Sequence, residues 1–365
     1  MSADELLREA ERVMTICNAC RYCEGFCAVF PAMELRRTFA AEELRYLANL
    51  CHNCRGCWYA CQYAPPHEFA VNVPRALAAL RRTTWQEFGR PKRFSGLFRR
   101  NGLAVWAAGL AAAAVFLLWG ALSAESGLWA ARSGAGAFYR VIPYGAMLGV
   151  FSALALGALA ALAAGLFSFL RQTGTKASEF FAPGHQLRAL KDVLRLTYLE
   201  GGGHGCNYPD ERFRHGRRRL HHLVFYGFLA AFASTTAAAF YDHVLGLPAP
   251  YPWLSLPVLL GLGGGLAMTA GLCGLMVLKA RMDREPADEE GRGMELAFLG
   301  LLLAVNGTGL LLLFLRETAA MGVLLALHLA AVAAFFALLP YGKFVHALYR
   351  WAALVKNASE QSKAG

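Results

Sequence analysis

The sequence has little charge. Only 17% of its 365 residues are Asp, Glu, Lys or Arg, against about 25% in soluble globular proteins. Hydrophobic residues make up 56%, and the mean hydropathy is +0.36. This composition excludes an ordinary soluble globule. The N-terminus MSADELLREA also lacks the apolar stretch of a secretory signal peptide, so we expect no disulfide scaffold from the ten cysteines.

Recognisable catalytic sets are also absent from the sequence. There is no Ser-His-Asp set, no carboxylate pair and no dinucleotide fingerprint after a strand. The segment GGGHGCNYPDERF, residues 201–213, is rich in glycine, but it follows no predicted strand and lacks the lysine of a nucleotide-binding loop. We therefore predict no catalytic residues and no substrate-oxidising centre. Cys206 in this segment is interpreted as structural.

Long apolar runs begin only after residue 101. Residues 1–101 contain ten acidic residues and no run that could cross a bilayer, which takes about 20 apolar residues. We predict a water-soluble domain over residues 1–101 and a six-span membrane domain over 102–365, with helical spans because lipid offers backbone groups no other partner. The predicted spans are 103–122, 143–170, 223–241, 253–278, 296–315 and 321–339.

The basic residues are distributed unevenly around these spans. If the soluble domain is cytoplasmic, 33 of the 36 Lys and Arg residues lie on the cytoplasmic side, and only Arg132, Arg140 and Arg316 lie on the other. This is the positive-inside pattern, and it predicts that both termini are cytoplasmic. The net charge of +11 is thereby explained by topology, so we predict no nucleic-acid partner. The cytoplasmic loop 171–222 is too long for a simple connector and contains an amphipathic helix stopped by glycines.

Eight cysteines form a duplicated motif, which is the most specific signal in the chain. The spacing C-x2-C-x2-C-x3-C occurs at Cys17, Cys20, Cys23 and Cys27 and again at Cys51, Cys54, Cys57 and Cys61. In two-cluster ferredoxins the fourth cysteine of each run binds the other cluster. We therefore predict two [4Fe-4S] clusters with crossed ligands, although the proline usual after the fourth cysteine is absent here. One ligand set is Cys17, Cys20, Cys23 and Cys61, and the other is Cys51, Cys54, Cys57 and Cys27.

The alternative interpretation of these cysteines is structural zinc. Zinc sites are usually built from two C-x2-C pairs rather than from doubled triplets. Between the motifs, residues 33–50 have a helical pattern and lack the alternation of strands. The predicted fold class is therefore all-α: an α-helical ferredoxin-like domain followed by a six-helix transmembrane bundle. Two clusters in one small module predict one-electron relay.

Histidines at the ends of two spans suggest haem. On the sixth span His328 and His346 are eighteen residues apart, so they share a helix face and are separated by about 27 Å. On the third span, His243 lies on nearly the same helix face as His221 and is slightly further round the helix from His222. We predict that His221 or His222 pairs with His346 near the cytoplasmic side, and His243 with His328 near the outer side. Each pair could hold one b-type haem; the alternative is that these are solvated interfacial side chains.

Several segments together resemble one known family. They are CNACRYCEGFC, CHNCRGCWYAC, LTYLEGGGHGCNYPDERF, RRRLHHLVFYGF and APYPWLSLPV. With these, the chain resembles the tricarballylate (citrate) utilization protein B family of membrane iron–sulfur proteins over nearly its whole length. The resemblance implies a protein of the bacterial cytoplasmic (inner) membrane in tricarballylate utilization.

The resemblance also implies a partner and an acceptor. The chain would reoxidise the FAD of a separate dehydrogenase and pass electrons through the clusters and haem b to the quinone pool. It would thus be the electron-transfer component of a flavoprotein dehydrogenase:quinone oxidoreductase system. One alternative is a membrane subunit of the nitrate-reductase-gamma or heterodisulfide-reductase type that serves another soluble partner. The other is a non-catalytic iron–sulfur redox sensor.

Overall fold

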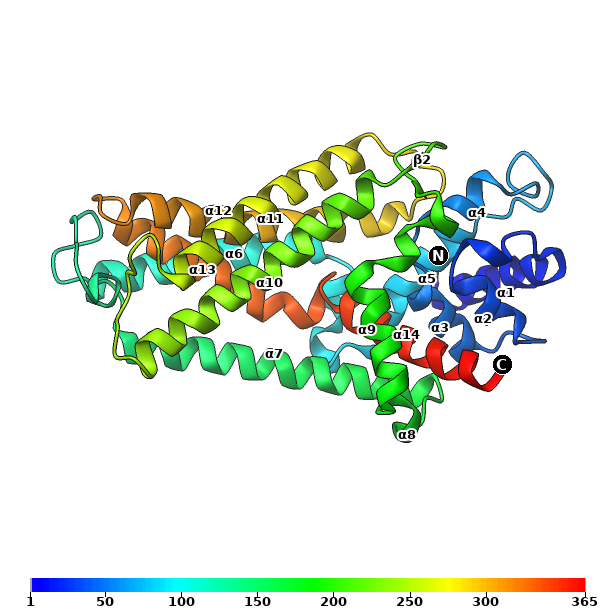
Figure 1. Cartoon of the computed structure of the whole chain (residues 1–365), viewed down its shortest axis with the longest axis horizontal. Helices are drawn as coiled ribbons and strands as arrows, with labels where there is room; N and C mark the ends of the chain where they lie inside the picture. The colour runs from blue at the N-terminus through cyan, green and yellow to red at the C-terminus, as the bar shows by residue number, and fades with distance from the viewer. Residues whose placement is uncertain (1, 365) are drawn as a thin grey trace.

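The chain is almost entirely helical, which confirms the all-α prediction. The computed structural model describes residues 2–364. Its only strands in that range are the two-residue β1 (Cys206–Asn207) and β2 (Phe213–Arg214), which pair antiparallel. In Figure 1 the N-terminal helices and both chain termini lie at one end of an elongated molecule, and long helices extend from there to the other end.

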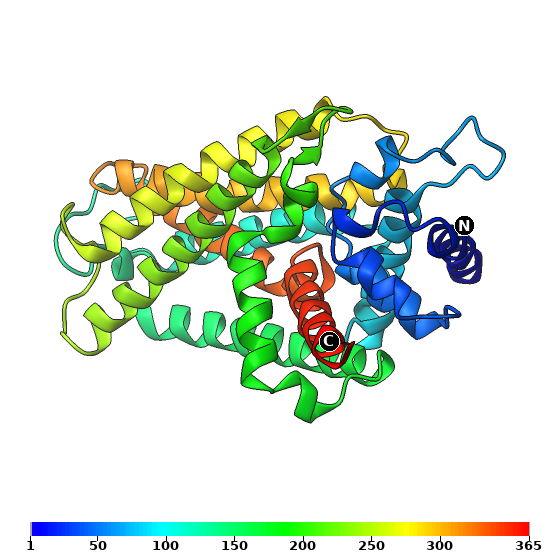
Figure 2. The ribbon, with the colours of Figure 1, turned by 45° about the vertical axis from the view of Figure 1, so that its right-hand side comes forward.

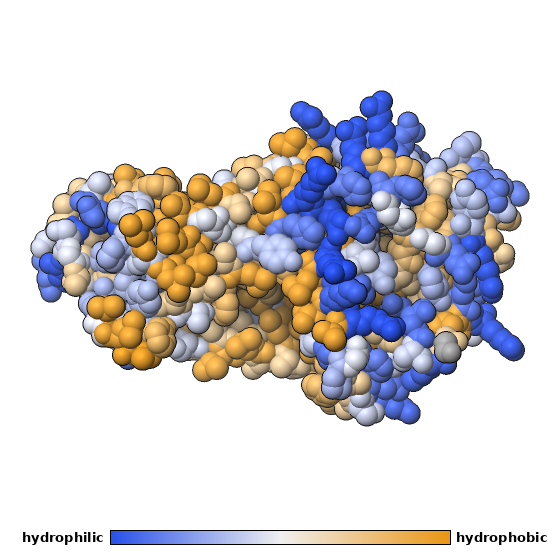
Figure 3. All heavy atoms as spheres, viewed as in Figure 1, coloured by the Kyte–Doolittle hydropathy of each residue, from blue (hydrophilic) through white to orange (hydrophobic). Residues whose placement is uncertain are grey.

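Six helices are long and apolar enough to cross a membrane, as expected for a multi-pass membrane protein. Five of them, all except α13, carry exposed large hydrophobic side chains, Trp106 by 72% for example, which is the surface that lipid would cover. Figure 3 shows the same division, with apolar atoms along the elongated part and hydrophilic atoms concentrated at the end that holds the termini. The six helices are α6 (Asn101–Ser123), α7 (Tyr144–Gln172), α10 (Gly216–His243), α11 (Leu256–Ala280), α12 (Arg292–Leu315) and α13 (Met321–Leu338).

The N-terminal region is a bundle of short helices around one apolar core. Helix α1 starts at a capping box in which Ser2 and Glu5 bond each other's backbone N–H groups. Asn72 caps α5, where Pro74 occupies the second helical position. Leu47 and Leu77 are among the fully buried side chains of the core. The helices are α1 (Ala3–Cys20), α2 (Val29–Glu34), α3 (Ala41–Leu50), α4 (Gly56–Tyr59) and α5 (Val73–Phe88).

The C-terminal helix completes this N-terminal core. Helix α14 (Val345–Ala364) buries Tyr349 and Val355 in the same apolar cluster as α1, α3 and α5. Arg36 of the turn after α2 bonds Glu360 at 2.6 Å. Figures 1 and 2 show α14 in red between the blue N-terminal helices and the green segment that precedes α10. Helix α14 is therefore packed into the N-terminal module and is not a tail of the six-helix bundle.

The long loop 171–222 folds back against this module. It contains α8 (Ala177–Phe180) and the amphipathic helix α9 (Pro183–Arg195), which ends at Leu196 in the left-handed conformation. Ala189 of α9 is fully buried in the core that α14 shares. The predicted amphipathic helix is present, but it stops before the glycines, which form a separate turn at Gly201–Gly203.

Glycines bring α10 and α11 into backbone contact. A methyl group at Gly264 would lie 2.7 Å from the Cβ of Ala230 and 2.8 Å from the carbonyl oxygen of Gly227. Such close approach is the usual role of small residues between membrane helices. The helix pair therefore depends on the absence of a side chain at Gly264.

We predict that Gly264→Ala destabilises the protein by about 1–3 kcal/mol, because the added methyl group overpacks a contact with rigid backbone. The thermal unfolding midpoint of the detergent-solubilised protein measures this. Gly263→Ala is the matched control, since a methyl group there would meet nothing within 4 Å. Equal midpoints for the two variants would contradict the contact.

Candidate metal centres

The two cysteine motifs share one backbone feature. In each motif the residue after the second cysteine is an arginine in the left-handed conformation, Arg21 with φ 56° and Arg55 with φ 68°. In the first motif this residue ends α1 just after Cys20, and in the second it precedes α4. The motifs therefore share a left-handed arginine, but Cys17 and Cys20 lie on a helix whereas Cys51 and Cys54 lie on irregular backbone.

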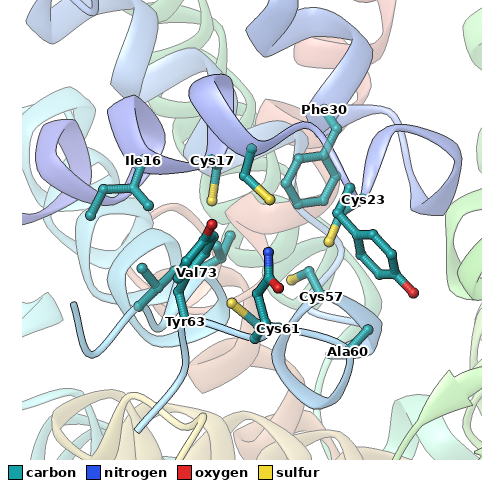
Figure 4. A pocket seen from close by; sticks show the side chains of 13 residues that line it. Ile16, Cys17, Cys23, Phe30, Cys57, Ala60, Cys61, Tyr63 and Val73 are labelled. Carbon is teal, nitrogen blue, oxygen red and sulfur yellow. The ribbon is translucent and has the colours of Figure 1, made fainter. Parts of the chain in front are cut away.

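The first predicted ligand set surrounds a single cavity of about 230 Å³. Figure 4 shows the side chains that line it, with sulfur atoms directed inward from both motifs. Burial, and after it the neighbouring thiols, raises the pKa of Cys17 and of Cys23 to about 12. Thiols that are this hard to ionise become thiolates when they bind a metal. The cysteines that line the cavity are Cys17, Cys20, Cys23, Cys57 and Cys61.

The second predicted set lies deeper. Cys51 and Cys54 are only 8% and 6% exposed. Burial, followed by the charges of Cys54 and Cys51, raises the pKa of the Cys27 thiol well above its ordinary value. The same cause, with Cys54, Cys27 and Cys51 as neighbours, raises the pKa of Cys57. Cys27 is thus close to Cys51 and Cys54, and Cys61 lines the cavity with Cys17, Cys20 and Cys23, which Cys57 of the second motif lines as well. The crossed assignment of ligands stays a prediction.

The donor chemistry fits iron–sulfur clusters. Each set supplies four soft sulfur donors, which suit iron–sulfur clusters. A single tetrahedral zinc ion would need four sulfur atoms about 2.3 Å from one point. Thiols of both motifs lie around one cavity, an arrangement that suits a polynuclear cluster better than a single ion.

The structure brings together one of the two predicted histidine pairs. His221 of α10 and His346 of α14 have ring centroids 6.4 Å apart. Two imidazoles on opposite sides of one metal, each bonded at about 2.0 Å, have centroids about 6 Å apart. The Nδ1 of His346 lies 2.5 Å from the carbonyl oxygen of Lys343, which leaves Nε2 free, and the Nδ1 of His221 is buried without a hydrogen-bond partner in the described chain. These residues fit a bis-histidine haem.

His222 has a different environment from His221. Its ring lies 5.7 Å from that of Tyr226, and the Tyr226 hydroxyl donates to the carbonyl oxygen of Leu194 in α9. Of the two histidines that the sequence left open, the geometry therefore favours His221.

The predicted outer pair shares no contact. His243 is exposed at the end of α10, and its Nε2 lies 2.6 Å from the hydroxyl oxygen of Tyr144. His328 lies in α13, where its Nδ1 is 3.1 Å from the Thr308 hydroxyl and its ring contacts Gly309 of α12. Each of these histidines is hydrogen-bonded to a different helix, so the structure does not bring them together.

Comparison with known proteins places this chain in a family. The model of "Citrate utilization protein B" matches residues 96–365, and the model of the "Citrate utilization protein B Fer4-like domain" matches residues 10–87. The chain belongs to the citrate utilization protein B family. A relative from Escherichia coli, described as "Citrate utilization protein B", is 44% identical over 359 residues, which cover 97% of this chain and 93% of the relative. No solved structure matches.

Membership in the citrate utilization protein B family confirms the resemblance found in the sequence. The Fer4-like match, residues 10–87, contains all eight cysteines of the two motifs, as expected for an iron–sulfur protein.

In this member of the citrate utilization protein B family, Cys206 is close to the second motif. The backbone N–H of Asn207 donates to the carbonyl oxygen of Cys54 at 3.1 Å, and Cys54 and Cys206 share a small apolar cluster. The Cys206 thiol donates to the carbonyl oxygen of Leu199 at 3.1 Å. A second thiol is therefore near Cys206, which the sequence did not indicate. The hydrogen bond agrees with a structural role, in which the glycine-rich loop is held against the second motif.

Sequence reasoning missed the arginines around the second motif. Arg81, Arg217 and Arg350 come from α5, α10 and α14, and all three donate to backbone carbonyl groups of residues 51–53. No spacing signal links them, because they are brought together only by the packing of α10 and α14 on the N-terminal module. An alignment of related sequences could identify these arginines without a structure.

Proposed function

We propose that this chain is the membrane electron-transfer component that reoxidises an FAD-dependent dehydrogenase of the tricarballylate type. In this proposal, electrons from the flavin pass through two [4Fe-4S] clusters and haem b to the quinone pool. The observation that carries the proposal is that cysteines of both motifs lie around one cavity, with Cys27 beside Cys51 and Cys54. The dehydrogenase performs the carbon chemistry, and this chain moves electrons.

The residues present support each part of such a path. The first cysteine set lines a cavity that has exposed Tyr22 at its edge, which is where a soluble partner could approach. The second set lies between that cavity and the membrane helices. Cluster thiolates supply one-electron chemistry when iron is bound. The protein's own contribution is to hold the donors, exclude water from the deeper set and keep the two sets adjacent.

The position of the His221–His346 pair supports a step through haem b into the membrane. His221 belongs to a membrane helix and His346 to the C-terminal helix of the cytoplasmic-type module, so the pair lies at the junction of the two parts. The Lys343 carbonyl group that receives the Nδ1 proton of His346 would orient the ring for a metal bond through Nε2. We propose one haem at this pair and none at His243 and His328.

The proposed orientation places both termini in the bacterial cytoplasm. Both termini lie at the same end of the molecule (Figure 1), as an even number of spans requires. That end also carries most of the Lys and Arg residues, in keeping with the positive-inside rule. The clusters would then meet a cytoplasmic dehydrogenase.

The metal content of the purified protein tests the proposal. We expect about eight irons in clusters, a similar amount of acid-labile sulfide and one haem b per chain. Iron, sulfide and the pyridine-haemochrome difference spectrum of the detergent-purified protein measure these quantities. Zinc without labile sulfide would contradict the cluster proposal, and clusters without haem would contradict the role of His221 and His346. Addition of the reduced dehydrogenase and a quinone analogue then tests the direction of transfer.

A further inference from the structure

Three arginines, the buried Arg81 and the half-buried Arg217 and Arg350, donate to the loop of the second cysteine motif. Arg81 donates to the carbonyl oxygen of Cys51 at 2.7 Å, and Arg350 donates to the same oxygen at 2.9 Å. Arg217 donates to the carbonyl oxygen of Asn53 at 2.5 Å. Within residues 2–364, none of the three forms an ion pair with Asp or Glu. The buried charge of Arg81 is costly without a counter-charge, so an anion bound at this site would stabilise it.

A [4Fe-4S] cluster with four thiolates is such an anion. The arginines hold the loop that carries Cys51 and Cys54, so their charge acts at short range on that ligand set. In the first motif, Arg21 donates to the carbonyl oxygen of Asn18 at 3.0 Å, but this arginine is exposed.

The arginine that follows the second cysteine of each motif allows the two sites to be compared. Arg21 and Arg55 occupy equivalent positions in the two motifs with the same left-handed backbone. Arg21 is exposed, whereas Arg55 is 2% exposed and lies over the Tyr208 ring, with Nη1 donating to the carbonyl oxygen of Asp283. Water and salt screen a charge like that of Arg21, but they screen a buried one much less. Positive charge is therefore concentrated on the second motif although both motifs contain an arginine.

The same helices connect the arginines with the histidine pair. Arg217 precedes His221 by four residues in α10, and Arg350 follows His346 by four residues in α14. Four residues are about one helical turn, or 6 Å along the axis. The arginines that bond residues 51–53 thus lie one turn from His221 and from His346. Two arginine side chains therefore link the second motif to the helices that carry the histidine pair.

We propose that Arg81, Arg217 and Arg350 give the second cluster a higher reduction potential than the first, and so make it the electron-receiving centre next to the histidine pair. The inference rests on the proposed function. A nearby positive charge stabilises the reduced cluster, which is one unit more negative than the oxidised one. In the transfer, the first cluster is oxidised by one electron and the second is reduced by it, and no proton or bond moves.

The test is an EPR-monitored redox titration of the full-length protein in detergent. In the wild-type protein we expect two one-electron midpoints. Arg350→Gln should lower the higher midpoint by at least about 59 mV, which is a tenfold change in the equilibrium constant of a one-electron reduction. The lower midpoint should stay in place. Arg350→Lys should restore most of the shift, because it retains the charge. Arg21→Gln is the matched control and should move neither midpoint.

The outcomes separate charge from structure. If Arg350→Lys lowers the midpoint as much as Arg350→Gln, the hydrogen bond and not the charge is responsible, and the proposal is overturned. A shift of the lower midpoint, or no shift, also overturns it. If Arg350→Gln loses a cluster, the same titration on Arg217→Gln decides, because Arg217 bonds the same loop from α10. A wild-type protein without iron and labile sulfide would overturn the proposed function itself, whereas two clusters with unmoved potentials would overturn only this inference.

Discussion

Replacement of Cys54 by Ser should abolish electron transfer from the reduced dehydrogenase to a quinone analogue. We expect less than about 1% of the wild-type rate, because a hard hydroxyl group replaces one of the four soft thiolate ligands of a cluster. Cys20→Ser should have the same effect through the other set. The rate is measured in membranes that contain the chain and its flavoprotein partner.

The membrane part should survive these changes. The cysteine motifs lie outside the six long helices, so the variants should still appear in the membrane fraction at near wild-type amounts. Cys273→Ser is the matched control, because Cys273 is an exposed cysteine of α11 far from both motifs in sequence. This variant should transfer electrons normally. A wild-type rate in Cys54→Ser would show that the clusters are not on the path.

Replacement of His346 by Ala should remove the haem. We expect haem b to fall below about a tenth of the wild-type content, because the variant lacks one of the two histidines by which the protein would hold the haem iron. Pyridine-haemochrome spectra of the purified variants measure the content. Iron and sulfide in the clusters should stay unchanged, since His346 is not among the cysteine sets.

His222→Ala separates the two adjacent histidines. It should retain haem, because His222 lies against Tyr226 and not against His346. His221→Ala should behave like His346→Ala. Full haem content in both His221→Ala and His346→Ala would refute the pair, and loss of haem in His222→Ala alone would exchange the roles of the two residues.

Much of the architecture could be predicted because it depends on local pattern. The observed spans start and end within a few residues of those predicted, except that α10 begins at Gly216 instead of residue 223. There the basic residues 217–219 continue the helix beyond the apolar stretch. Hydropathy identifies the part of a helix that lipid covers, but it does not show how far the helix continues in polar residues beyond the lipid.

The histidine pairs could be predicted only in part. Helix periodicity places His328 and His346 on one face if the helix is continuous, but a turn at Leu339–Tyr341 interrupts it and a new helix begins at Val345. His346 therefore belongs to α14, and its position relative to His328 is not set by one helical axis. Pro340 in this turn is the signal that could have indicated the break.

The sequence by itself determined the eight cysteine positions, the six apolar spans and the all-α class, because each depends on spacing or composition within one segment. Tertiary structure alone decided that α14 completes the N-terminal core, that His221 faces His346, and that Arg81, Arg217 and Arg350 meet at one loop. These residues come from segments more than a hundred positions apart. Their contacts depend on how whole helices pack against one another, and the periodicity within one segment does not predict that packing.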